Sequence, residues 1–173
     1  MRVFSQDDSR LGLLTVRRRR LTAHGVQPLG VIQHTFEWFD VYGAVAPATG
    51  EGFFLELPYR NADMFQLFVD AFAQAFPDSL NSWLLANSGA HTAQRLRWPE
   101  NMRCVWLPPY CPELNPIERL WRDLKDDLAW QPFTDLETQQ DHISRMLQAY
   151  KASTLQSLTG YAYLVDAINA LAS

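Results

Sequence analysis

The stretch that decides the fold is residues 107–121, LPPYCPELNPIERLW. Four prolines fall within nine residues of it, at positions 108, 109, 112 and 116, which predicts a rigid loop. The sequence then predicts a helix with Asn115 as its N-cap and Pro116 at its first position, where proline is favoured. One face of that helix carries Ile117, Leu120, Trp121, Leu124 and Leu128. A proline-rich loop leading into an amphipathic helix is therefore expected.

Strand and helix patterns precede this loop. Residues 104–107 and 83–85 are short apolar runs of the kind found in buried parallel strands. Asn61 is a good N-cap for a helix that Pro77 ends. We expect the apolar face of that helix to consist of Met64, Leu67, Phe68, Ala71, Phe72 and Ala75.

The first 57 residues are predicted to be mostly extended. Residues 2–6 and 11–16 read as two short strands joined by a turn at residues 7–10, and such strands should pair as a hairpin. An extended stretch is expected around residues 31–45. A turn at 47–50 and a strand at 52–57 complete this part of the chain.

Two helical segments are expected after residue 130. Thr134 and Glu137 form an S/T-x-x-E capping box ahead of a helix that carries Leu136, Ile143, Leu147 and Tyr150. A last helix, broken near Gly160, carries Leu164, Val165, Ile168 and Leu171. The order of strands and helices predicts one α/β or α+β domain with a mixed sheet over residues 1–173.

Composition narrows the class of protein. A chain of 173 residues with 47% apolar content can bury a sizeable core, so disordered, collagen-like and disulfide-stapled classes are excluded. Cys104 and Cys111 match neither a zinc knuckle nor a redox pair, and we interpret them as structural thiols. No apolar run approaches the ~20 residues of a membrane helix, and no signal peptide is visible. We therefore expect a cytoplasmic protein that does not associate with membranes.

Candidate catalytic residues stand at the ends of the predicted strands, where functional groups gather in open sheets. The first strand delivers Asp7, residues 83–85 deliver Ala86 and Asn87, and residues 104–107 deliver the loop that leads to Glu118. Carboxylates on separate elements can share two Mg²⁺ ions about 3.5 to 4 Å apart, an arrangement that supports phosphoryl transfer. From spacing alone, Asp7 could equally be a turn residue and Glu118 the partner in a capping box.

Three stretches of the sequence resemble one protein family. Residues 107–121 closely resemble the signature of DDE-superfamily endonucleases, the transposases of a bacterial insertion-sequence group related to the mariner elements. Residues 6–12, QDDSRLG, and 84–91, LLANSGAH, are similar to the segments that carry the family's first and second acids. The resemblance implies a ribonuclease-H-like α/β fold, with a mixed five-stranded sheet flanked by helices. It also implies an Asp-Asp-Glu site with two Mg²⁺ or Mn²⁺ ions.

The family pattern assigns roles to individual positions. The resemblance makes Asp7 the first acid, which bridges both metals, and Glu118 the third, which holds one of them. The second-acid position is occupied by Ala86, whose methyl group cannot coordinate a metal. Losing one carboxylate of three removes a ligand and a negative charge, so we predict that the chain is catalytically dead or nearly so.

Candidate DNA contacts are Arg17, Arg18, Arg19, Arg20, His91 and Tyr110. The four arginines could instead be a solvated hairpin tip, but beside a phosphate-processing face they make a plausible backbone-binding patch. His91 is either a structural residue or a phosphate contact near the site. Tyr110 either stacks on a base or packs against Trp121.

Two hypotheses about function follow. The first is a transposase catalytic domain that cleaves and transfers DNA strands, impaired by Ala86. The second is a catalytically inactive remnant that retains DNA binding or dimerisation. We expect this chain to lack the helix-turn-helix region that precedes the catalytic strand in the family, and we therefore expect recognition of transposon ends to come from an upstream transposase half. A homodimer is the other partner considered.

Overall fold

The computed structural model describes residues 1–19, 21–27, 29–86 and 95–172. Its centre is a five-stranded sheet in the order β3-β2-β1-β4-β5. The strands are β1 (Arg2–Gly12), β2 (Trp38–Val45), β3 (Gly52–Leu57), β4 (Asn81–Leu85) and β5 (Met102–Trp106). β1 pairs antiparallel with β2 and parallel with β4, and β5 continues the parallel part. The predicted mixed five-stranded sheet flanked by helices is confirmed.

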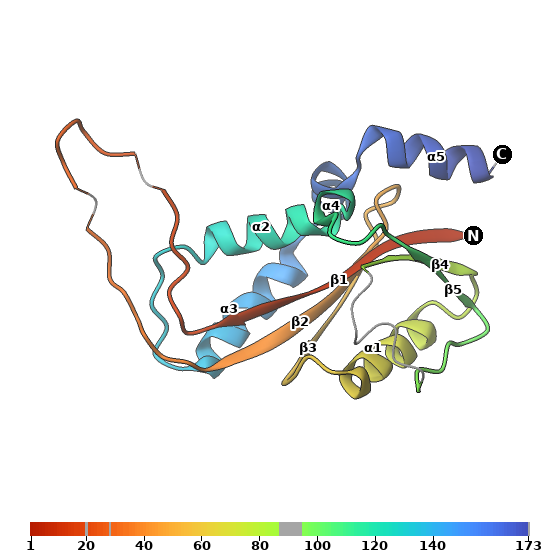
Figure 1. Cartoon of the computed structure of the whole chain (residues 1–173), viewed down its shortest axis with the longest axis horizontal. Helices are drawn as coiled ribbons and strands as arrows, with labels where there is room; N and C mark the ends of the chain where they lie inside the picture. Colours follow the sequence, from red (N-terminus) through yellow and green to blue (C-terminus); the bar gives the residue numbers. More distant parts are fainter. Residues whose placement is uncertain (20, 28, 87–94, 173) are drawn as a thin grey trace.

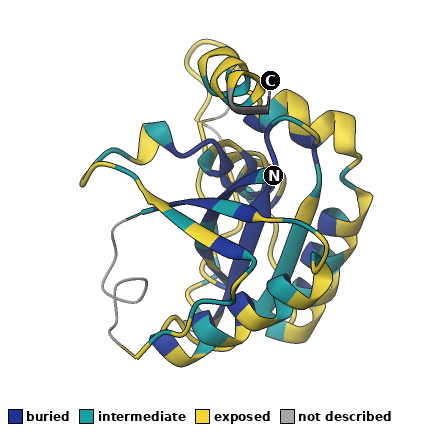
Figure 2. Cartoon of the chain, turned by 90° about the vertical axis from the view of Figure 1, so that its right-hand side faces the viewer, coloured by how far each residue is buried: buried dark blue, intermediate teal, exposed yellow. Residues whose placement is uncertain are grey.

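Helices cover both faces of the sheet (Figure 1). One face packs on α1 (Ala62–Ala75) through Phe4, Phe68, Phe72 and Trp83. The other face packs on α2 (Ile117–Asp127), α3 (Leu136–Ala149) and α4 (Ala152–Thr159). The last helix, α5 (Ala162–Ala172), follows a break at Gly160, as predicted. Figure 2 shows buried residues along the central strands, whereas the helix at the C-terminus is largely exposed.

The predicted N-terminal hairpin is wrong. Residues 2–12 form one continuous strand, and residues 7–10, expected to turn, pair with residues 40–43 of β2. Polar side chains usually favour a turn, but here Asp8 forms an ion pair with Arg60, and Arg10 forms one with Asp40. The extended stretch expected around 31–45 is a strand only from Trp38 onward. The turn at 47–50 and the strand at 52–57 are confirmed.

The predicted apolar face of α2 is buried, whereas the face of α1 and the cap of α3 differ from the prediction. Asn61 caps α1 as expected, accepting from the backbone N–H of Asp63 and Met64. The buried face of α1 is rotated toward Phe65 and Val69, while the predicted Leu67 is 50% exposed. Asp135, not Thr134, caps α3, because its side chain accepts from the backbone N–H of Thr138.

β5 is parallel, as predicted, but it is not buried. It lies at the edge of the sheet, and the side chains of Val105 and Trp106 are both more than two-fifths exposed. An apolar run therefore indicated a strand correctly but not its place in the sheet. Within the described residues, none of the helices combines the length and apolar character needed to cross a bilayer.

Candidate active site

A pocket of about 390 Å³ collects the three positions of the predicted acid triad. Its walls come from β1, the residue after β4, the loop after β5 and the beginning of α2. The lining residues are Asp7, Ala86, residues 107–112, Asn115 and Glu118. A larger hollow lies between β3 and helices α3 and α4, but no member of the predicted triad lines it. We therefore take the smaller pocket as the candidate active site.

Asp7 projects from the middle strand toward α2. Its carboxylate oxygen Oδ2 accepts a hydrogen bond from the indole Nε1 of Trp121 at 3.1 Å. Trp121 is buried and lies against Gly43, the residue paired with Asp7 across the sheet. A Cβ at position 43 would approach Trp121 Cη2 to 2.7 Å, so only glycine leaves room for the indole. Asp7 is a strand residue, and the interpretation of it as a turn residue is wrong.

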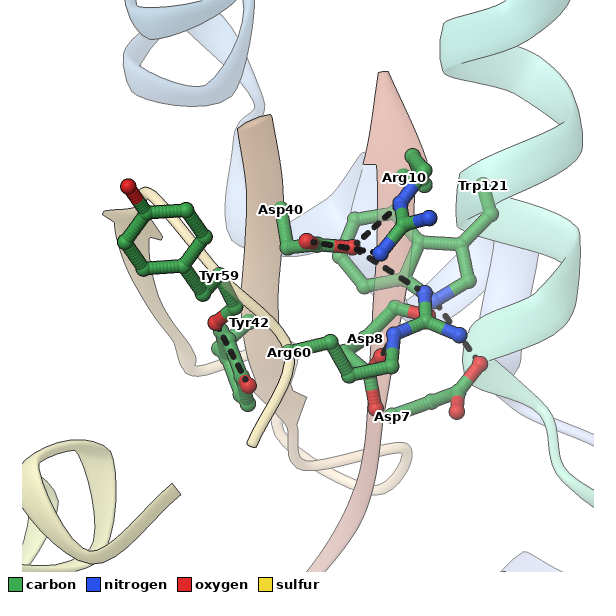
Figure 3. A network of polar contacts seen from close by, with 8 residues as sticks. All are labelled: Asp7, Asp8, Arg10, Asp40, Tyr42, Tyr59, Arg60 and Trp121. Carbon is green, nitrogen blue, oxygen red and sulfur yellow. Dashed lines mark hydrogen bonds and ion pairs between the residues drawn. The ribbon is translucent and has the colours of Figure 1, made fainter. Parts of the chain in front are cut away.

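Asp8 points to the opposite face of β1, as its position next to Asp7 predicts. There it forms an ion pair with Arg60, which also contacts the buried Asp40 at 3.3 Å. Arg10 reaches the same Asp40 carboxylate at 3.3 Å. Figure 3 shows these side chains as one cluster, with the guanidinium of Arg60 between the carboxylates of Asp8 and Asp40.

Tyr42 borders this cluster, and the charges of the cluster affect the pKa of its hydroxyl. Its hydroxyl donates to the backbone carbonyl of Tyr59 at 3.2 Å (Figure 3). Burial, together with the negative charges of Asp8 and Asp40, raises the pKa of Tyr42 to about 12. The tyrosine is therefore neutral at physiological pH and can donate this hydrogen bond.

Glu118 lies in the first turn of α2. The predicted capping box around it is wrong, because Pro116 stands at the N-cap position and no side chain caps this helix. Asn115 instead donates its side-chain N–H to the backbone carbonyl of Gln6 at 2.9 Å. This hydrogen bond ties the entrance of α2 to β1, one residue before Asp7, and so holds Glu118 beside the strand that carries Asp7.

Lys125 is a cation close to the candidate acids, two turns along α2 from Glu118. Burial lowers the pKa of Lys125, and the negative charges of Glu118 and Asp7 act in the opposite direction. Lys125 and Arg60 were not among the predicted site residues. A spacing of seven residues from Glu118 was the only signal in the sequence for Lys125, and Arg60 gave none.

The predicted DNA contacts lie in different environments. Arg17, Arg18 and Arg19 are exposed, and Arg18 forms an ion pair with Asp126. Arg20 and His91 fall outside the described residues. Tyr110 lines the candidate pocket and is fully exposed, at a positive φ of 60°. Its predicted alternative role, packing against Trp121, is wrong, because Trp121 packs edge-on against Phe54 instead.

The donor set of the pocket suits one divalent cation. Asp7 and Glu118 supply carboxylate oxygens, and Mg²⁺ is commonly bound through one or two carboxylates with water completing the octahedron. Ala86 supplies no donor, and no group of three or more His, Cys, Asp or Glu side chains is arranged for metal binding in the part of the chain that the structure describes. The described residues therefore fit one Mg²⁺ or Mn²⁺ ion better than a pair.

The sheet order, with helices on both faces, is that of a ribonuclease-H-like fold. Residues 2–140 match the family of DDE superfamily endonucleases, and the chain belongs to that family. An uncharacterized protein of Sinorhizobium fredii (strain NBRC 101917 / NGR234) is 33% identical over 91 residues, which cover 52% of this chain and 67% of that protein.

Solved structures of the Mos1 transposase share the fold. The paired-end complex of Mos1 with the left transposon end has a TM-score of 0.68 at 16% identity, covering 91% of this chain and 51% of the Mos1 chain. The Mos1 mariner paired-end complex with Mn has a TM-score of 0.68 at 17% identity, covering 95% and 53%. The chain thus spans about half the length of the Mos1 chains, and this likeness shows the fold.

Proposed function

We propose that the chain is the catalytic domain of a DDE-type transposase, over residues 1–173, and that Ala86 impairs its cleavage of DNA. The observation that carries this proposal is the pocket in which Asp7, Ala86 and Glu118 meet from three separate elements. Membership of the DDE superfamily endonucleases supports the reaction class. In that class a nucleophilic water, and then a DNA 3′-hydroxyl, attacks a phosphodiester in line, without a covalent enzyme intermediate.

In this proposal residues in and around the pocket bind the metal, orient its ligands and contact the DNA. Asp7 and Glu118 hold a divalent cation, Mg²⁺ or Mn²⁺, which when bound supplies positive charge to the reacting phosphate. Trp121 fixes the orientation of the Asp7 carboxylate through its indole N–H. Asn115 fixes the entrance of α2 against β1, which keeps Glu118 near Asp7. Tyr110, exposed on the proline-rich loop, offers a ring on which a base can stack.

DNA is the partner in this proposal. Arg17, Arg18, Arg19 and Arg20 contact its backbone, and His91 contributes a phosphate contact near the site. One of the Mos1 structures described above is a paired-end complex with the left transposon end, which supports DNA as the partner by analogy of fold. Recognition of the ends of a transposon would come from an upstream transposase half or from a second copy of the chain.

The experiment that tests the proposal restores the missing acid. Ala86→Asp should nick supercoiled plasmid in Mn²⁺ at least about 100-fold faster than the parent. Mutating residues that only hydrogen-bond to metal ligands already changes activity by about 10–100-fold, and a ligand itself should matter at least as much. Ala86→Asn is the matched control, because it has nearly the same shape without the charge. Adding Glu118→Gln to Ala86→Asp should abolish the gain. Equal, robust nicking by the parent and by Ala86→Asp would contradict the proposed impairment.

A second candidate function follows from the same residue. Ala86 favours a catalytically inactive module that binds DNA or dimerises and interferes with an intact relative. Salt-dependent DNA binding by the parent, without nicking by either the parent or Ala86→Asp, would support this module over an impaired enzyme.

A further inference from the structure

A second hollow adjoins the candidate active site along α2. Its volume is about 580 Å³, and it shares Pro112 and Glu118 with the active-site pocket. Four basic residues line it: Arg18, Arg119, Arg122 and Lys125. We call this hollow the α2 groove. Because the two hollows share a wall, a polymer bound at Asp7 and Glu118 can continue directly into the α2 groove.

The positive charge of the α2 groove is a local feature of an acidic chain. The whole sequence carries a formal charge of −4, yet the groove gathers four cations against Glu113 and Glu118. The acids on the other side of α2 are engaged with α3. Asp123 accepts from the Tyr150 hydroxyl at 2.6 Å, and Asp127 lies 3.2 Å from the ring Nε2 of His142. Asp126, the remaining acid of α2, forms the ion pair with Arg18, so Arg119, Arg122 and Lys125 give the groove its positive charge.

Two arginines of the groove are free to bind an anion. Among the described residues, neither Arg119 nor Arg122 forms an ion pair with a carboxylate. The guanidinium of Arg119 lies 4.1 Å from the ring centroid of Tyr161, which in turn stacks on Tyr163. This stacking leaves the forked N–H groups of the guanidinium available for phosphate oxygens.

We propose that the α2 groove binds the sugar–phosphate backbone of the DNA strand that continues beyond the reacting phosphate, through Arg119 and Arg122. The inference rests on the proposed function, since it assumes that DNA occupies the neighbouring pocket. Two further observations select a nucleic-acid backbone as the occupant: the charge of the groove and its continuity with that pocket. Arg17 and Arg19, which lie on either side of Arg18 along the chain, are also exposed.

The test measures how DNA affinity changes with salt concentration. EDTA is present throughout, so that neither metal binding nor catalysis contributes. A fluorescent duplex with a single-stranded extension is titrated with the parent, with Arg119→Gln/Arg122→Gln and with Arg119→Lys/Arg122→Lys. For each phosphate that a variant no longer binds, the slope of log K against log salt should fall in magnitude by about 0.9 on duplex DNA or about 0.7 on a single strand. The slope of the double Gln variant should therefore be smaller in magnitude by about 1.4 to 1.8.

The controls separate charge in the groove from charge anywhere on the protein. Arg95→Gln removes a cation that pairs with Asp63 of α1, on the opposite face of the sheet, and should leave the slope unchanged. The double Lys variant keeps the charge and should retain most of the slope. Thermal melting of each variant establishes that it is folded before its affinity is compared.

Three results would overturn the inference, and they are distinguishable. If the parent binds DNA and a folded double Gln variant keeps its slope, the groove does not bind the backbone, and the proposed function stands. If the parent binds no DNA even at low salt, the proposed function itself fails. Competition by poly-glutamate as strong as that by DNA of equal charge would indicate an acidic protein partner instead.

Discussion

At the scale of single residues, the position of Asp7 depends on the fit between Trp121 and Gly43. The indole both donates to the Asp7 carboxylate and fills the space that a side chain at position 43 would need. Gly43→Ala should destabilise the protein by about 1–3 kcal/mol, because it overpacks a buried site against a rigid ring. Urea denaturation of the variant and the parent measures this cost.

A double-mutant cycle checks the mechanism of that cost. Trp121→Phe removes the ring atoms nearest to position 43, so Gly43→Ala should cost much less in a Trp121→Phe background than alone. Strictly additive free energies would mean that Gly43 is required for some reason other than the indole. Trp121→Phe by itself should also destabilise the protein, since it removes the hydrogen bond to a charged carboxylate.

At the scale of elements, β3 and α3 are joined by a hydrogen bond from the Ser144 hydroxyl to Glu56. Burial raises the pKa of Glu56 above its ordinary value of 4.5, and the nearby Asp141 adds to the shift, while the bond from Ser144 opposes it. The folded state therefore binds a proton at Glu56 more tightly than the unfolded state does.

The sign of the pH dependence follows from that shift. Between pH 4.5 and the raised pKa of Glu56 the folded state holds more protons than the unfolded state, so this residue makes stability fall as pH rises. Glu56→Gln should remove this component and gain stability relative to the parent at pH 7.5 but not at pH 4. Urea midpoints at several pH values measure it. Parallel curves for Glu56→Gln and the parent would contradict the prediction.

Ser144→Ala is the matched variant for this prediction. It removes the hydrogen bond that stabilises the ionised carboxylate, so the pKa of Glu56 should rise further and the loss of stability with pH should become larger. The same substitution in a Glu56→Gln background should leave the pH dependence unchanged.

At the scale of the whole molecule, Arg60 connects the segment before α1 to the two central strands. It contacts Asp8 on β1 and Asp40 on β2, and both carboxylates are almost completely buried. Arg60→Met should destabilise the protein by about 3 kcal/mol, because it removes the cation that both buried carboxylates contact. Replacing Asp8 with Asn in the Arg60→Met variant should recover part of this loss. Thermal or urea unfolding of the three proteins measures both effects.

The candidate site was largely predictable from the sequence, because its members stand at recognisable places along the chain. Asp7, Ala86 and Glu118 each follow or precede a pattern of strand or helix, and all three line one pocket, while their roles at the site stay predictions. Lys125, Arg119 and Arg122 were missed. Charged residues on a helix are usually solvated, and only the packing of α2 shows which of its sides faces the site.

The sequence by itself determined the local elements of this protein: the apolar periodicity of α2, the cap at Asn61, the turn at residues 47–50 and the proline-rich loop. These features depend on neighbours a few residues apart. The tertiary structure alone decided that residues 2–12 are one strand, that β5 lies at the edge, and that Asn115 bonds to β1 rather than capping α2. The physical reason is that each of these outcomes depends on partners from distant segments, whose contacts outweigh local preference.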